Sequence, residues 1–139
     1  MKPITRNILA VIIGLVIGNV LNMSLVNLGL NIYPIEGYDG KDFEFLAKVM
    51  PTLPFAYFIF PFLAHALGTL AGAFVAGLIA ATHKMKFAMA IGGFFLIGGI
   101  LVNIMITGPI WFTLVDIFFA YIPMAWFGGK LALTFSKQN

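Results

Sequence analysis

Residues 54–81 read PFAYFIFPFLAHALGTLAGAFVAGLIAA, an apolar stretch that contains one histidine and no Asp, Glu, Lys or Arg. A helix that crosses a bilayer needs about 20 mostly apolar residues, and this stretch is longer than that. Three more apolar runs of comparable length lie at about 8–30, 87–107 and 109–133. None of the runs shows the alternation that is typical of a membrane barrel strand. The pattern predicts an all-α integral membrane protein with four transmembrane helices, and the short turns between later runs predict an antiparallel bundle.

The composition excludes most water-soluble proteins. Of the 139 residues, 61% are hydrophobic and 9% are charged, and the mean hydropathy is +1.03. A soluble domain carries about a quarter charged residues, so this chain has too few charges to cover a surface exposed to water. An ordinary soluble enzyme, a disordered tail and a free nucleic-acid binder are therefore excluded, and residues 1–139 are expected to form a single membrane domain. The sequence has no cysteine, which excludes thiolate catalysis and cysteine-bound zinc and leaves the redox compartment open.

Basic residues gather on one side of the predicted spans. Six of the eight Lys and Arg fall on that side, and they are Lys2, Arg6, Lys84, Lys86, Lys130 and Lys137. The other side carries Lys41 and Lys48 among four acidic residues. Because cytoplasmic loops of membrane proteins are enriched in Lys and Arg, both termini are predicted to be cytoplasmic.

The one sizeable loop, at 31–53, is then predicted to lie outside the cell membrane. Asp42 is a suitable N-cap, and Pro51 ends the helical pattern that follows it. Glu44 and Lys48 are spaced as an i,i+4 ion pair on such a helix. These signals favour a short amphipathic helix that lies on the outer leaflet. The alternative is a simple connector between two spans.

Polar residues within the predicted spans lie at the midplane or in the outer half. Asp116 is the one acid inside a span, and His65 is the one histidine inside a span. A charged Asp near the bilayer centre costs roughly 2.5–3.5 kcal/mol, so Asp116 should face protein or water rather than lipid. Helical spacing directs several of these groups toward shared faces, which predicts a polar pocket in the outer half of the membrane. Its candidate ligand-binding residues are Asp116, His65, Asn22, Asn103, Asn19 and Thr69.

A structural interpretation of the same residues stays open. The histidine and the acid would then be a buried pair, and the Asn residues would form hydrogen bonds between helices that are worth about 0.6 kcal/mol each on average. No second histidine stands three or four residues from His65, so no metal site is expected, and no cofactor motif is present.

For the function, we expect binding or transport of a small solute or cation through the pocket, with Asp116 as the charged anchor and His65 as its titrating partner. Four helices make a thin bundle, so a complete path favours a homo-oligomer, for which glycine faces offer an interface. The alternatives are a non-catalytic assembly subunit, or an intramembrane enzyme that uses His65 and Asp116 as acid and base on a lipid-like substrate. In length and number of spans the chain resembles the small multidrug exporters, but its first span lacks the glutamate expected of that family.

Overall fold

The structure is a computed structural model that describes residues 1–137, and over this range its regular elements are all helical. In chain order they are α1 (Pro3–Ile32), α2 (Phe43–Val49), η1 (Met50–Thr52), η2 (Phe55–Phe58), α3 (Ile59–Ile79), α4 (Lys84–Met105), α5 (Ile110–Phe119) and α6 (Ile122–Lys137). Four helical segments, at 3–32, 55–79, 84–105 and 110–137, are long and apolar enough to cross a membrane. The prediction of four long apolar helices is therefore confirmed.

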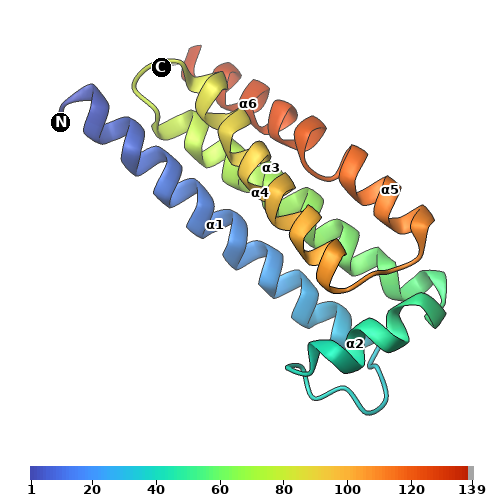
Figure 1. The fold of residues 1–139 in the computed structure, drawn as a ribbon. Helices are drawn as coiled ribbons and strands as arrows, with labels where there is room; N and C mark the ends of the chain where they lie inside the picture. Colours follow the sequence, from blue (N-terminus) through green and yellow to red (C-terminus); the bar gives the residue numbers. More distant parts are fainter. Residues whose placement is uncertain (138–139) are drawn as a thin grey trace.

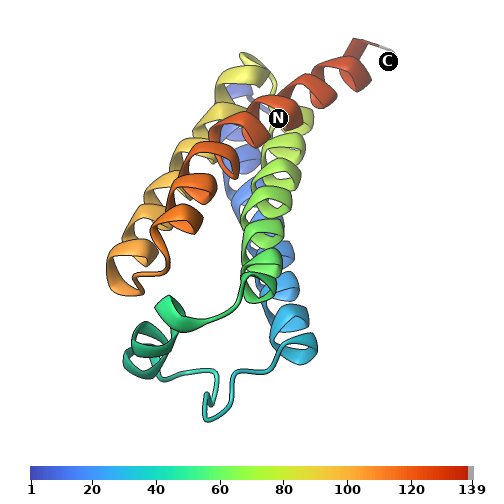
Figure 2. The ribbon, with the colours of Figure 1, turned by 90° about the vertical axis from the view of Figure 1, so that its right-hand side faces the viewer.

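The four long segments lie side by side, and the chain turns back between one and the next (Figure 1). The start of α1, the end of α6 and the turn at 80–83 lie at one end of the molecule, which we call the terminal end. The segment 33–58 and the turn at 106–109 lie at the opposite end, which we call the loop end. α3 is the central helix, because it packs against α1, α4 and α6. Figure 2 shows α2 set apart from the long helices at the loop end.

Glycines let α1 and α3 approach until their backbones touch. A methyl carbon at Gly14 would lie 2.7 Å from the carbonyl oxygen of Gly72, and one at Gly18 would lie 2.7 Å from that of Gly68. Small residues four apart on both partners are typical of close pairs of membrane helices, in which van der Waals packing takes the place of the hydrophobic effect. Because this contact holds one face of α3 against α1, it also sets the direction in which His65 points.

Small residues also form the core between α3, α4 and α6. The buried cluster there consists of Ala73, Ala76, Ala88, Ile91 and Ala125. Large apolar side chains lie on the outside instead, and those of Phe94, Ile104 and Phe118 are 62%, 71% and 66% exposed. The sequence suggested glycine faces as an interface between copies, and the glycines of α1 and α3 pack against each other inside one chain.

Basic side chains at the terminal end cap the C-terminus of α3. The Arg6 guanidinium donates a hydrogen bond to the carbonyl of Ile79. The Lys84 ammonium donates to the carbonyls of Gly77 and Leu78, at 3.2 and 3.0 Å. The last carbonyls of a helix have no partner within it and carry partial negative charge, so cations stabilise them. These contacts fasten α1 and the start of α4 to the end of α3.

The segment at the loop end contains the short helix predicted there. α2 begins after Asp42, whose carboxylate accepts a hydrogen bond from the backbone N–H of Phe45 at 2.9 Å. Lys48 donates to Glu44 at 2.9 Å, and both side chains are largely exposed. An exposed pair of this kind contributes little to stability because solvent screens its charges, so the cap matters at least as much as the pair.

The last predicted span is two helices rather than one. The sequence predicts one span over 109–133 with Pro123 as a point where its helix can kink, and in the structure α5 ends at Phe119 and α6 begins at Ile122. Pro123 has no N–H to donate to the carbonyl four residues earlier, so the helical hydrogen-bond ladder is interrupted at this point. Tyr121 lies in the interruption and is buried.

Candidate functional site

The site is centred on a contact between α3 and α5. His65 Nδ1 lies 2.7 Å from Asp116 Oδ1, although the two residues are 51 positions apart in the sequence. The Asp116 side chain is completely buried, and 19% of the His65 side chain is exposed. The structure thus brings together the acid and the histidine that the sequence singles out.

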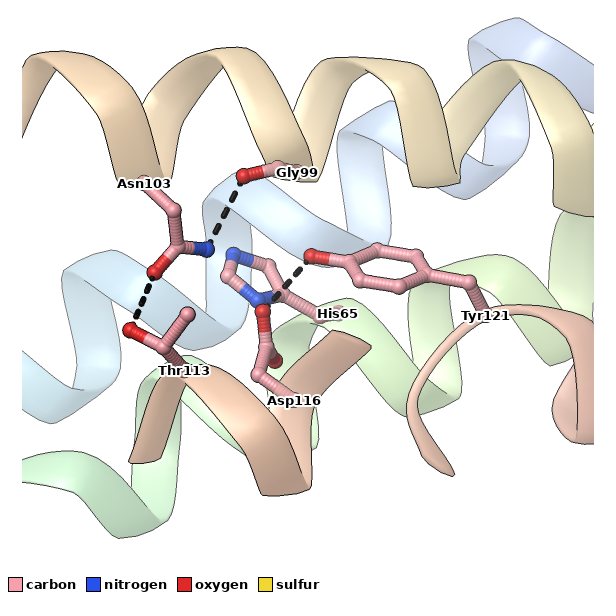
Figure 3. A network of polar contacts seen from close by, with 6 residues as sticks. All are labelled: His65, Gly99, Asn103, Thr113, Asp116 and Tyr121. Carbon is pink, nitrogen blue, oxygen red and sulfur yellow. Dashed lines mark hydrogen bonds and ion pairs between the residues drawn. The ribbon is translucent and has the colours of Figure 1, made fainter. Parts of the chain in front are cut away.

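Tyr121 completes this group, and the sequence did not predict it. Its hydroxyl donates a hydrogen bond to Asp116 Oδ2 at 2.8 Å, and its ring stacks on the His65 ring with 5.7 Å between centroids. Figure 3 shows His65 and Tyr121 meeting the carboxylate together. In an unbroken helix, residues five apart point about 140° away from each other, so Tyr121 reaches Asp116 because the helix is interrupted. Pro123 was the one sequence signal for this bend. We call His65, Asp116 and Tyr121 the carboxylate cluster.

A second small network lies beside the carboxylate cluster. The Asn103 side-chain amide donates to the Gly99 carbonyl and accepts from the Thr113 hydroxyl, each at 2.9 Å. Figure 3 shows this network and the carboxylate cluster facing the same space between α3, α4 and α5. Gly99 also makes room for Tyr121, because a methyl carbon at Gly99 would collide with the tyrosine hydroxyl. Asn103 therefore lies at the site, with its amide already bonded.

The net charge of the carboxylate cluster depends on one proton. An ionised carboxylate can only accept hydrogen bonds, so with Asp116 ionised the Nδ1 atom of His65 carries a hydrogen. The other ring nitrogen, Nε2, has no hydrogen-bond partner in the described part of the chain. The cluster is negative when Nε2 lacks a proton and neutral when Nε2 holds one. An uncompensated buried charge is costly, so a proton or another cation at Nε2 would stabilise the ionised carboxylate.

Other side chains do not supply that positive charge within residues 1–137. The basic residues of the helices that pack around the cluster lie toward the terminal end, and they are Arg6, Lys84, Lys86, Lys130 and Lys137. Arg6, for example, meets α3 at Ile79, about 21 Å along the helix axis from His65.

The remaining predicted residues are not all gathered at this site. Asn19 is exposed on the surface of α1, because the preceding residue, Gly18, faces α3. Asn22 is half-buried at the contact between α1 and α3. Thr69 is completely buried one turn along α3 from His65, and among the described residues its hydroxyl has no hydrogen-bond partner. The six candidates therefore do not line one polar pocket, since the rotation of α1 turns Asn19 outward.

Two hollows lie at the loop end. One is a half-open hollow of about 150 Å³ between η2, α3 and α5, and we call it the aromatic cavity. All of its walls are apolar, and five of them are the aromatic residues Phe55, Phe58, Phe62, Trp111 and Phe112. The other is an open hollow of about 360 Å³ between the end of α1 and residues 34–40, and its walls include Asn27, Asn31 and Asp39. Neither hollow is lined by His65 or Asp116 themselves.

A metal centre has no support from the arrangement of side chains. Within residues 1–137, no three His, Asp or Glu side chains lie close enough together to hold a metal ion. Comparison with known protein families, curated proteins and solved structures found no match.

Proposed function

We propose that this chain is a multi-pass integral membrane protein with both termini in the cytoplasm. Alanine and glycine fill its core, while large apolar side chains cover its outer surface, which is the reverse of a water-soluble domain. The basic residues at the terminal end and the acidic residues of segment 33–58 support this orientation. In this arrangement α2 lies along the outer face of the membrane.

The protein binds or transports a small solute or cation in exchange for a proton at the carboxylate cluster. The observation that carries this proposal is the 2.7 Å contact between His65 Nδ1 and the fully buried Asp116. Paired ionisable groups inside membrane helices commonly mark ion, proton or substrate pathways. Because one positive charge at Nε2 stabilises the ionised carboxylate, a proton on Nε2 and a cationic solute compete for the same role.

Asp116 and His65 have different roles in the proposed site. Asp116 has no exposed surface, and each of its oxygens already accepts a hydrogen bond. It is the charged anchor, but it acts on the solute through His65. His65 is partly exposed and is the titrating partner that meets the solute with Nε2. The carboxylate accepts a hydrogen bond from Nδ1–H, and this bond fixes the tautomer of His65 with its hydrogen on Nδ1.

Proton release tests this competition. The protein in lipid nanodiscs, in weak buffer with a pH indicator, is titrated with Na⁺, methylammonium and 2-phenylethylammonium in turn. We expect at least one of these cations to displace a proton. The Asp116→Asn variant, which keeps the shape and removes the charge, should release none. Asp39→Asn, at an exposed loop position, is the matched control and should release as many protons as the wild type. Release that persists in Asp116→Asn, or no release from the wild type, rejects the proposal.

The same geometry favours a second candidate, an intramembrane enzyme with His65 as general base. A carboxylate at Nδ1 leaves Nε2 as the basic nitrogen, which can take a proton from a lipid-like substrate. Incubation of lipid vesicles with wild type and with His65→Gln separates the candidates. A lipid product that forms with the wild type alone supports the enzyme, and an unchanged lipid composition rejects it.

A further inference from the structure

We infer that the preferred solute is a lipophilic primary ammonium ion, meaning an apolar body about the size of a benzene ring that carries one –NH₃⁺ group. This inference rests on the proposed function and adds the chemical class of the solute. The aromatic cavity receives the apolar body, and His65 Nε2 receives the ammonium. Three observations carry it: the position of the cavity, the nature of its walls, and the charge of the cluster beside it.

The aromatic cavity and the carboxylate cluster are built on the same two helices. On α3, Phe62 lines the cavity three positions before His65. On α5, Phe112 lines it four positions before Asp116. Residues three or four apart on a helix share a face and are separated by one turn, about 5–6 Å along the axis. Phe62 also packs against the buried cluster that contains Tyr121. Two walls of the cavity, Phe62 and Phe112, therefore lie about one helical turn from the cluster.

The cavity suits an apolar group and not a bare metal ion. The aromatic cavity is open on one side, and its volume of about 150 Å³ matches that of an apolar cavity that holds benzene. Ions such as Ca²⁺ or Mg²⁺ need about six or more oxygen ligands, whereas no polar side chain lines this cavity. Its walls are packed against one another, with 4.8 Å between the ring centroids of Phe58 and Phe112 and 5.3 Å between those of Phe58 and Trp111. Aromatic faces of this kind also attract cations.

The cluster suits an ammonium group by charge and by hydrogen bonding. The titratable groups that face His65 are Asp116 from α5 and Tyr121 from the break before α6, while the basic residues of α1, α4 and α6 lie toward the terminal end. When the proton leaves Nε2 for water, Nε2 becomes a hydrogen-bond acceptor, and an N–H of the arriving ammonium donates to it. The site stays neutral throughout, because one positive charge replaces another. One proton is therefore released for each ammonium ion bound.

The cation titration in nanodiscs tests the inference when the three cations are compared. We expect 2-phenylethylammonium to release one proton per protein at a concentration about 10- to 100-fold lower than methylammonium, because burial of the ring adds affinity. Na⁺ should release none at these concentrations. Equal potency of the two ammonium ions, or release by Na⁺ alone, overturns the inference and leaves the proposed function standing. No release by any of the three overturns the proposed function itself.

A variant that fills the aromatic cavity tests whether the apolar body of the solute binds there, while the charge of the carboxylate cluster stays unchanged. Val115→Phe adds a ring at a residue that lines the cavity. In this variant, 2-phenylethylammonium should release a proton only at a concentration as high as methylammonium needs. Leu114→Phe adds the same ring at the neighbouring position, which is exposed like Val115 but does not line the cavity, and it should change nothing. If Val115→Phe does not fold, Ile59→Phe fills the cavity from α3 instead. A folded cavity-filling variant with wild-type potency would show that the ring binds elsewhere.

Discussion

A single carboxylate decides the geometry of the site. Asp116 accepts a hydrogen bond from His65 on one oxygen and from Tyr121 on the other. If one donor is removed, a buried oxygen loses its partner, which costs more than the net value of the bond. The carboxylate therefore holds two rings from different parts of the chain in fixed positions, and the site is sensitive to the loss of one hydroxyl.

Tyr121→Phe removes that hydroxyl and keeps the ring. We expect the variant to lower the free energy of unfolding by about 1.5–3 kcal/mol, the range for a hydrogen bond to a charged group. Equilibrium unfolding in mixed detergent micelles measures the change. Tyr57→Phe is the matched control, because its hydroxyl makes only a long contact of 3.4 Å with the Pro34 carbonyl. Equal effects of the two substitutions would contradict a specific role for the bond to Asp116.

Helix packing turns the functional side chains inward. The close approach of α1 and α3 depends on glycines at matching positions, and the break between α5 and α6 depends on Pro123. The first feature orients His65, and the second turns Tyr121 back to Asp116. Substitutions that disturb these backbone contacts should therefore change the geometry of the carboxylate cluster even when no residue of the cluster is replaced.

Gly18→Ala tests the packing of α1 against α3. The new methyl carbon would lie 2.7 Å from the Gly68 carbonyl oxygen, and backbone at that distance cannot move aside without separating the helices. Overpacking of this kind costs about 1–3 kcal/mol of stability. Gly93→Ala is the control, since nothing lies within 4 Å of its added carbon, and it should leave stability unchanged or raise it by up to about 1 kcal/mol through helix propensity. Unfolding in micelles distinguishes the two, and a harmless Gly18→Ala would refute the close contact.

Charge is distributed unevenly over the molecule as a whole. The terminal end holds six of the eight Lys and Arg residues, while segment 33–58 holds the other two with four acids. If the chain spans a membrane, this asymmetry orients it, because translocation of Lys and Arg is disfavoured. The carboxylate cluster then lies nearer the outer face than the cytoplasmic face.

Single cysteines test this orientation cleanly, because the sequence contains none of its own. Lys41→Cys places a thiol in the loop-end segment, and Lys86→Cys places one at the terminal end with the same change of charge. In spheroplasts of an expression host, a membrane-impermeant maleimide should label Cys at 41 directly and Cys at 86 only after permeabilisation. The reverse pattern contradicts the orientation, and labelling of both from outside contradicts four spans.

Features that depend on local chemistry were predictable from the sequence. The lengths of the apolar runs predict the four long helices, and Asp42 predicts the start of α2, because hydrophobicity and capping act over a few neighbouring residues. Asp116 and His65 could be singled out as well, since ionisable groups are rare in apolar helices.

The features that make a site of these residues depended on how the helices are rotated and packed. Hydropathy alone does not reveal the angle at which a helix meets its neighbour when all of its faces are apolar. Backbone contacts between glycines set that angle, and they bring His65 to Asp116 while they turn Asn19 outward. Tyr121 joined the site at the break between α5 and α6, and Pro123 marks the place of this break but not the direction in which it turns the tyrosine. Long-range packing, and not local preference, therefore assembled the carboxylate cluster.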